Sequence, residues 1–109
     1  MGVDVLLLQI SPLGTSPKRR RLTELDAVLD RADVFARICA ASRLPMLGRV
    51  DPYGDLVLTA AEMPQLVGEV DVELGLAVGG PEREILAGVR RLAERCASDP
   101  SMELHLQGD

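Results

Sequence analysis

The chain has 109 residues, the size of one compact domain, and its 47% hydrophobic and 27% charged residues are an ordinary balance for a globular protein. A net charge of -5 argues against a surface that attracts phosphate as a whole, and one Phe and one Tyr leave nucleic-acid bases almost nothing to stack on. We therefore expect a single domain over residues 1–109 with an aliphatic core, and we do not expect nucleic acid as its partner.

The first ten residues predict a strand. Residues 3–10 are nearly all apolar and include the β-branched Val3, Val5 and Ile10, which is typical of a strand buried on both faces. The segment contains Asp4, has no basic leader or cleavage site, and is far too short to cross a bilayer. The expectation is a cytoplasmic protein without a membrane partner.

A loop and a long helix are predicted next. Residues 11–21 hold two prolines, a glycine and four cations, and they show no periodicity. Thr23 is a good N-cap with acidic residues after it, and apolar residues then recur at spacings of three and four. Because Pro45 cannot continue a helix and disfavours helical backbone at the residue before it, this helix should end near Arg43.

The stretch "VDPYGDLVLT" (50–59) contains turn chemistry. Asp51 can bond its own backbone, Pro52 presets a dihedral and Gly54 accepts a positive one, so "MLGRV" and "DLVLT" on either side predict a β-hairpin. Asp51 and Asp55 do not make a calcium loop, because alternating oxygen ligands and a closing glutamate are missing. Turn chemistry explains every residue here except Tyr53. Its ring either covers the edge of the hairpin or contacts a ligand or partner, as Asp51 or Asp55 could also do.

Two helices and a strand complete the chain. Thr59 and Glu62 have capping-box spacing, and apolar residues from Met63 to Leu74 mark the buried side of a second helix. Gly80 and Pro81 predict the start of a third helix that ends at residues 98–100. Residues 102–107 alternate between apolar and polar, the period of a strand that is wet on one side.

The predicted order is therefore βαββααβ, which is the split pattern of ferredoxin-like folds with a divided second crossover. It predicts an α+β, two-layer sandwich: a four-stranded antiparallel sheet with helices on one face. The first strand should lie beside the last strand and beside the second strand of the hairpin. Cys39 and Cys96 each fall on the apolar side of a predicted helix and are expected to be buried free thiols.

The other face of the sheet is the predicted binding surface. If Leu6, Leu8 and Ile10 point at the helices, then alternate residues of the first strand point outward, beside Glu103, His105, Gln107 and Val57. A half-apolar face of this kind usually marks a partner, and the alternative is that the loop 11–21 covers it. The predicted binding residues are Val5, Leu7, Gln9, Tyr53, Glu103 and His105.

His105 is the only histidine, so any proton transfer by imidazole must use it. A solvated surface position is the competing interpretation, and the chain lacks the further ligands that a metal site needs. No cofactor and no metal are expected. The basic run Lys18, Arg19, Arg20 and Arg21 is either a solvated loop or a contact for an anion or an acidic partner.

The stretches "LPMLGRVDPYGDLVLT", "PQLVGEV" and "CASDPSMELHLQGD" resemble a group of small proteins from actinobacteria. The resemblance covers about residues 33–109. It implies a stand-alone cytoplasmic bacterial protein in which the DPYG hairpin is a recurring element. It carries over no catalytic or binding residue.

The leading hypothesis is a non-catalytic association module of the immunity, accessory or regulatory type. It would act through the open sheet face on a second copy of itself or on another protein, since no Ser, Cys and His spacing suggests a nucleophile with its base. The alternative is a small-molecule-binding protein or minor enzyme with a pocket near His105 and the 11–21 loop.

Overall fold

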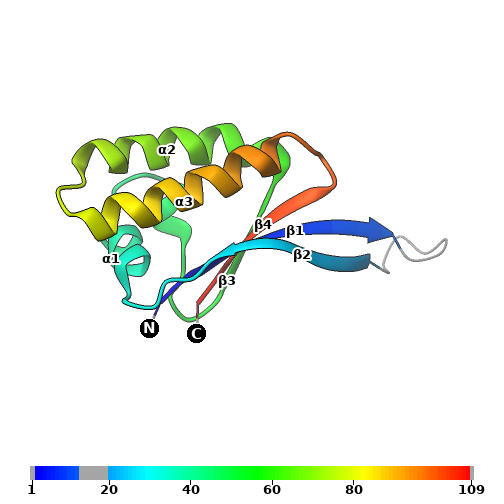
Figure 1. Cartoon of the computed structure of the whole chain (residues 1–109), viewed down its shortest axis with the longest axis horizontal. Helices are drawn as coiled ribbons and strands as arrows, with labels where there is room; N and C mark the ends of the chain where they lie inside the picture. The colour runs from blue at the N-terminus through cyan, green and yellow to red at the C-terminus, as the bar shows by residue number, and fades with distance from the viewer. Residues whose placement is uncertain (1, 13–19, 109) are drawn as a thin grey trace.

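The computed structural model describes residues 2–12 and 20–108 (Figure 1). Their strands are β1 (Asp4–Pro12), β2 (Arg20–Val28), β3 (Asp55–Thr59) and β4 (Met102–Gln107). The α-helices are α1 (Val34–Ala41), α2 (Met63–Leu76) and α3 (Gly80–Ala97). Two short 3-10 helices, η1 (Leu47–Arg49) and η2 (Ala60–Glu62), flank β3.

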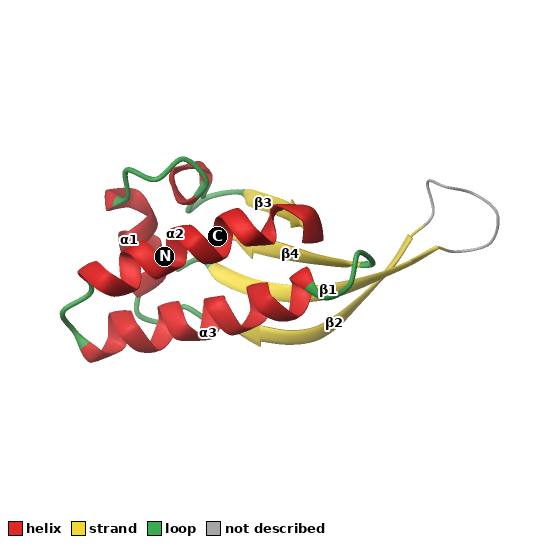
Figure 2. Ribbon diagram, turned by 90° about the horizontal axis from the view of Figure 1, so that it is seen from above, coloured by secondary structure: helices red, strands yellow, loops and turns green. Residues whose placement is uncertain are grey.

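The strands form one four-stranded antiparallel sheet in the order β2-β1-β4-β3. The helices lie over one face of this sheet, as Figures 1 and 2 show from two directions. The predicted α+β, two-layer sandwich is thus confirmed, and its layers are consistent with a ferredoxin-like sandwich, although the order of the elements differs from the predicted one. The first strand does pair with the last, but β3 pairs with β4 rather than with β1.

The predicted helix from Thr23 to Arg43 is wrong over its first half, where β2 pairs with β1 as a hairpin. The pairing skips Leu25, because Leu7 and Leu8 of β1 face Asp26 and Glu24. This β-bulge leaves apolar residues of β2 three positions apart, a spacing that imitates a helix. The observed order is therefore ββαβααβ, and α1 begins only after Asp33, whose φ of 61° lies in the left-handed region.

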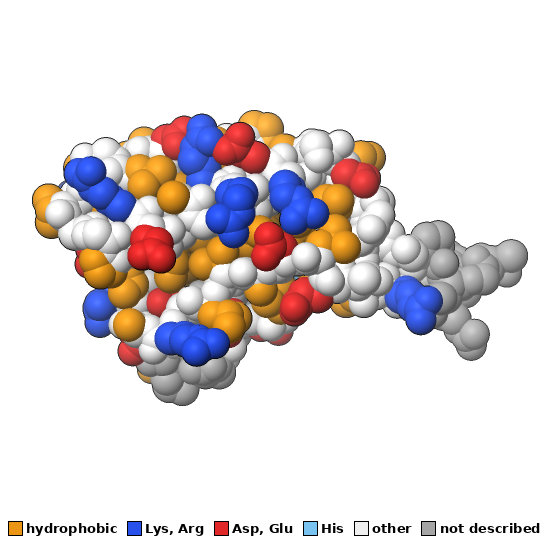
Figure 3. Space-filling model, viewed as in Figure 1, with side chains coloured by type: hydrophobic (Ala, Val, Ile, Leu, Met, Phe, Trp, Pro, Cys, Tyr) orange, Lys and Arg blue, Asp and Glu red, His pale blue; other side chains and the backbone are white. Residues whose placement is uncertain are grey.

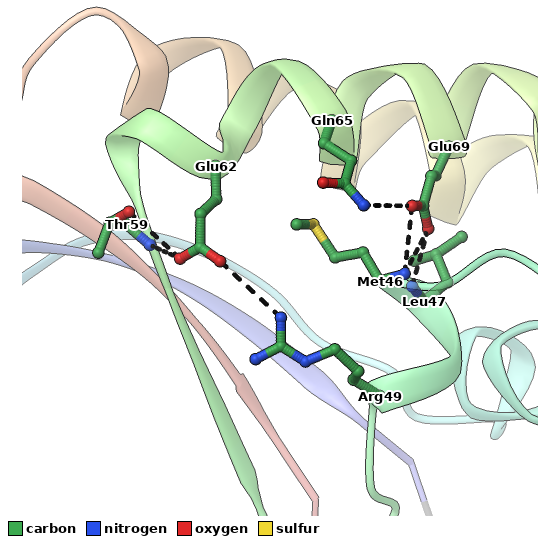
Figure 4. Close-up of polar contacts among 7 residues, drawn as sticks. All are labelled: Met46, Leu47, Arg49, Thr59, Glu62, Gln65 and Glu69. Carbon is green, nitrogen blue, oxygen red and sulfur yellow. Dashed lines mark hydrogen bonds and ion pairs between the residues drawn. The ribbon is translucent and has the colours of Figure 1, made fainter.

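The predicted first strand of the DPYG hairpin is also wrong, because that segment forms η1. The carboxylate of Glu69 on α2 accepts hydrogen bonds from the backbone N–H groups of Met46 (3.0 Å) and Leu47 (2.9 Å), as Figure 4 shows. Those donors are then not available to a sheet ladder.

Residues 51–54 do form the predicted turn. The N–H of Gly54 bonds to the carbonyl of Asp51 (3.3 Å), and that of Tyr53 bonds to the Asp51 side chain (2.8 Å). Gly108 packs against this turn, since a Cβ there would lie 2.3 Å from the Pro52 carbonyl carbon. The turn therefore closes against the end of β4 and leads from η1 into β3.

The core lies between the sheet and the helices. Its largest fully buried side chains include Phe35 of α1, Leu66 of α2 and Leu92 of α3, against Leu7 and Leu104 of the sheet. The second and third helices and the last strand are confirmed as predicted. Cys39 and Cys96 are buried and free, also as predicted.

Ion pairs join the outer surfaces of the helices. Arg90 of α3 binds Asp71 of α2 (2.6 Å) and Glu94 of its own helix. Figure 3 shows charges of both signs interspersed over the visible side of the helical layer. That side of the molecule therefore presents no field of a single sign.

Candidate functional site

The sheet face turned away from the helices is the candidate site, and the strand register defines its residues. Val5, Leu7, Leu104, Leu106 and Leu58 are fully buried on the helix side, so their neighbours along each strand point the other way. The open face is therefore built from Leu6, Leu8 and Ile10 of β1, Leu22, Glu24 and Arg20 of β2, Val57 of β3, and Glu103 and His105 of β4.

Three polar side chains bind one another across this face: Arg20, Glu103 and His105, here called the polar triad. The guanidinium of Arg20 lies 3.1 Å from one carboxylate oxygen of Glu103, and Nε2 of His105 lies 3.0 Å from the other. Because β1 separates β2 from β4, the Arg20 side chain passes over β1 to reach Glu103. Leu8, which is paired with Glu103, is only 7% exposed although it faces away from the helices. The ion pair thus lies across the apolar centre of the face.

Glu103 is held ionised by its neighbours. Burial alone would raise the pKa of its carboxyl, but the hydrogen bonds and charges of His105 and Arg20 outweigh burial and leave that pKa below its usual value. His105 is itself 9% exposed. The arrangement is an imidazole and a guanidinium sharing one carboxylate, which fixes all three groups in place.

Apolar side chains flank the polar triad. Leu22 of β2 is 48% exposed and Val57 of β3 is 43% exposed, and Leu6 and Ile10 are partly buried between them. Leu22 is not among the predicted binding residues, because the bulge at Leu25 makes this strand resemble a helix in the sequence. The Arg20–Glu103 pair could not be predicted either, since 83 positions separate the two residues.

Of the predicted binding residues, Glu103 and His105 lie on the open face. Val5 and Leu7 do not: both are fully buried under the helices, so the predicted face of the first strand was wrong by one residue. Gln9 shares their side of the sheet and is partly buried. Tyr53 is 72% exposed in the turn before β3.

The basic run is divided by the structure. Lys18 and Arg19 lie outside the described residues, as does the part of the 11–21 loop that would cover the face. Arg20 and Arg21 belong to β2, where Arg20 is bound to Glu103 and Arg21 is exposed on the other side of the strand.

Hollows on the described part of the surface lie elsewhere, and two of them are large enough to consider. One, of about 390 Å³, lies between the end of β2 and α3 and is lined by Asp30, Ile85 and Arg91 among others. The other, of about 320 Å³, lies between α1 and the turn from α2 to α3 and is lined by Ile38, Leu76 and others. Neither is lined by Glu103 or His105, so neither is the predicted pocket.

The buried carboxylate of Asp30 serves the fold. One of its oxygens accepts hydrogen bonds from the N–H groups of Val3 (3.1 Å) and Ala36 (2.9 Å), and its own N–H bonds to the side chain of Asp4 (2.8 Å). Asp30 thereby joins the start of β1 to the first turn of α1. Within residues 2–12 and 20–108, no cluster of His, Cys, Asp and Glu is arranged to hold a metal ion.

Comparison with protein-family models, curated proteins and solved structures finds no match to this chain. Over the same described ranges, no helix is both long and apolar enough to cross a membrane.

Proposed function

We propose that this protein is a non-catalytic module, of the immunity, accessory or regulatory type, that binds another protein chain through the open sheet face. The observation that carries the proposal is the pair of exposed apolar side chains, Leu22 and Val57, on a face that no described element covers. Exposed apolar area on a sheet, bordered by fixed polar groups, is typical of a protein interface.

The polar triad supports this interpretation. Arg20, Glu103 and His105 are already bound to one another, so a partner meets groups whose positions are fixed in advance and loses little side-chain entropy on binding. Arg20 also keeps donors free, because a guanidinium has five N–H groups and its side chain is 47% exposed. This supports specific polar contacts along the middle of the face, between the exposed Leu22 and Val57 on its outer strands.

The alternative of a small-molecule site at His105 has less support. A pocket for a small ligand is concave and encloses most of the ligand, whereas His105 lies on a sheet face beside the exposed Val57. The hollows described above are lined by other residues. We therefore keep association as the proposed function.

Photo-crosslinking in cells that make the protein tests the proposal. A benzophenone amino acid is placed at position 57 on the open face or, as the control, at position 72 on α2, where the valine is 49% exposed and so equally accessible. We expect one discrete protein adduct from position 57 and none from position 72. A Leu22→Glu substitution on the same face should remove the adduct.

The proposal fails if position 57 gives no adduct, or if both positions give the same products. Leu7→Glu is not a suitable variant, because Leu7 is fully buried and a charge there would unfold the protein. Circular dichroism of the Leu22→Glu variant confirms that a lost adduct reflects a lost contact rather than a lost fold.

A further inference from the structure

The outer edge of β2 is a second surface, distinct from the open face. β2 is the last strand of the sheet, and no described element lies beyond it in the view from above (Figure 2). Residues 20–25 of this strand are all exposed. A free strand edge presents unpaired backbone N–H and C=O groups, which another strand can pair with.

The charged residues of β2 are basic at its start and acidic toward its end. Arg20 and Arg21 stand at the start of the strand, and Glu24 and Asp26 follow Leu22. When such a strand meets a second copy of itself in antiparallel orientation, its basic half faces the acidic half of the other copy. The sequence of β2 is therefore complementary to itself.

The bulge at Leu25 limits how far a pairing can extend. A bulge disrupts the regular ladder and twists the strand, so regular pairing is available to the residues before it, Arg20 to Glu24. The centre of that segment is Leu22, which is 48% exposed.

We propose that two copies of this protein pair along β2, antiparallel, with the two-fold axis at Leu22. In this register Leu22 faces Leu22 of the other copy, and Arg20 faces its Glu24. By symmetry the second charge pair repeats the first. To make this pair the Arg20 side chain turns outward, away from Glu103, which lies on the other side of β2 across β1.

Neighbouring registers are less favourable. A shift that centres the axis on Thr23 brings the bulged Leu25 into the pairing and sets Leu22 against Glu24. A shift that centres it on Glu24 sets two like charges directly opposite each other, which is destabilising. The axis at Leu22 alone combines an apolar centre with unlike charges on either side.

The side chains that meet in this pairing also lie on one face of the sheet. Arg20, Leu22 and Glu24 all point to the open side of the sheet, and cross-strand neighbours in an antiparallel pair share a face. The two sheets would thus join into one, with all helices on the same side and the two open faces side by side. The inference goes beyond the proposed function, since it concerns a different surface and commits to a second copy as its occupant.

Sedimentation equilibrium over a concentration series tests the pairing on the wild-type protein and on the variants Arg20→Glu and Glu24→Arg. We expect a wild-type dimer whose Kd rises about tenfold or more in each variant, because each change turns two attractive cross-strand pairs into repulsive ones. Glu84→Arg on α3 is the control: it alters the net charge as Glu24→Arg does, but at an exposed position on a helix, and should leave the Kd unchanged.

Mixing the two variants gives the sharpest result. A heterodimer of Arg20→Glu with Glu24→Arg sets a glutamate against an arginine at both pairs, so the mixture should dimerise with a lower Kd than either variant alone. A wild-type monomer, or a dimer to which both variants and their mixture are indifferent, would overturn the pairing. A monomer that still gives the adduct at position 57 would overturn the pairing alone and leave the proposed function standing.

Discussion

Glu69 holds the segment before β3 against α2, and removing its carboxylate should cost the protein a large part of its stability. The side chain is 7% exposed and accepts hydrogen bonds from the backbone N–H groups of Met46 and Leu47 and from the side-chain amide of Gln65 (2.9 Å). Figure 4 shows these donors converging on it from η1 and from α2 itself. The hydrogen bonds of Glu69 thus set the conformation of the segment before β3 and hold this segment against α2.

The expected magnitude follows from the donors that are left behind. Glu69→Ala leaves two buried backbone N–H groups without an acceptor, at about 1–3 kcal/mol each, so we expect a loss of about 4 kcal/mol. Glu69→Gln keeps an acceptor oxygen but removes the charge, which weakens each bond by about 1 kcal/mol and gives a loss of about 2 kcal/mol. The free energy of unfolding of a single-domain protein is only about 5–15 kcal/mol, so the loss expected for Glu69→Ala is a large part of it.

Urea unfolding followed by circular dichroism measures these losses, because the chain has no tryptophan for fluorescence. Glu62→Gln is the matched control: it lies at the start of the same helical segment, but glutamine can also complete the capping box with Thr59, so its effect should stay within about 0.5 kcal/mol. If Glu69→Ala is as stable as this control, the hydrogen bonds of Glu69 do not hold the segment and the reasoning is refuted.

Three further predictions concern other parts of the fold. Burial raises the pKa of Cys39 to about 12 and that of Cys96 to about 11, so both thiols should resist iodoacetamide at pH 8 in the folded protein and react once urea unfolds it; fast labelling without denaturant would contradict this. The lowered pKa of Glu103 means that its ionised form stabilises the fold above the ordinary value of 4.5, and this contribution is lost as the pH falls through the lower folded-state pKa. Glu103→Gln should therefore make the unfolding free energy fall less steeply below pH 4.5. The same pH dependence in the variant and the wild type would contradict this prediction. Gly108→Ala should destabilise by about 2 kcal/mol in urea unfolding because its Cβ would meet the backbone of the DPYG turn, whereas Gly48→Ala, with open space around it, should change stability little; equal effects would show that the close packing does not matter.

The elements that could be predicted are those whose pattern is local. The apolar stripe of α3, the proline at its start and the alternation of β4 all depend on neighbouring residues, and all are confirmed. The segment of β2 misled the sequence analysis because Thr23 resembles an N-cap and the bulge at Leu25 breaks the period of two. The segment of η1 did so because its conformation depends on Glu69, which lies 23 positions from Met46.

The open face could be predicted only in part, and for a similar reason. Alternation in β4 assigns Glu103 and His105 to one side, because their neighbours are leucines. Alternation in β1 does not assign a face, because Leu6, Leu7 and Leu8 are the same residue type. Only packing against α3 and its neighbours decides which of them points at the helices.

The hydrogen bonds of Asp30 have a consequence for how the protein opens. Its side chain binds the N–H groups of Val3 and Ala36, and its own N–H binds Asp4, so the start of β1, the end of the hairpin and the first turn of α1 share one set of contacts. Because all three bonds meet at Asp30, an opening motion that displaces this residue breaks them together. Their hydrogens should therefore exchange with deuterium at similar, slow rates, and the beginning of β1 behaves as part of one cooperative unit instead of fraying.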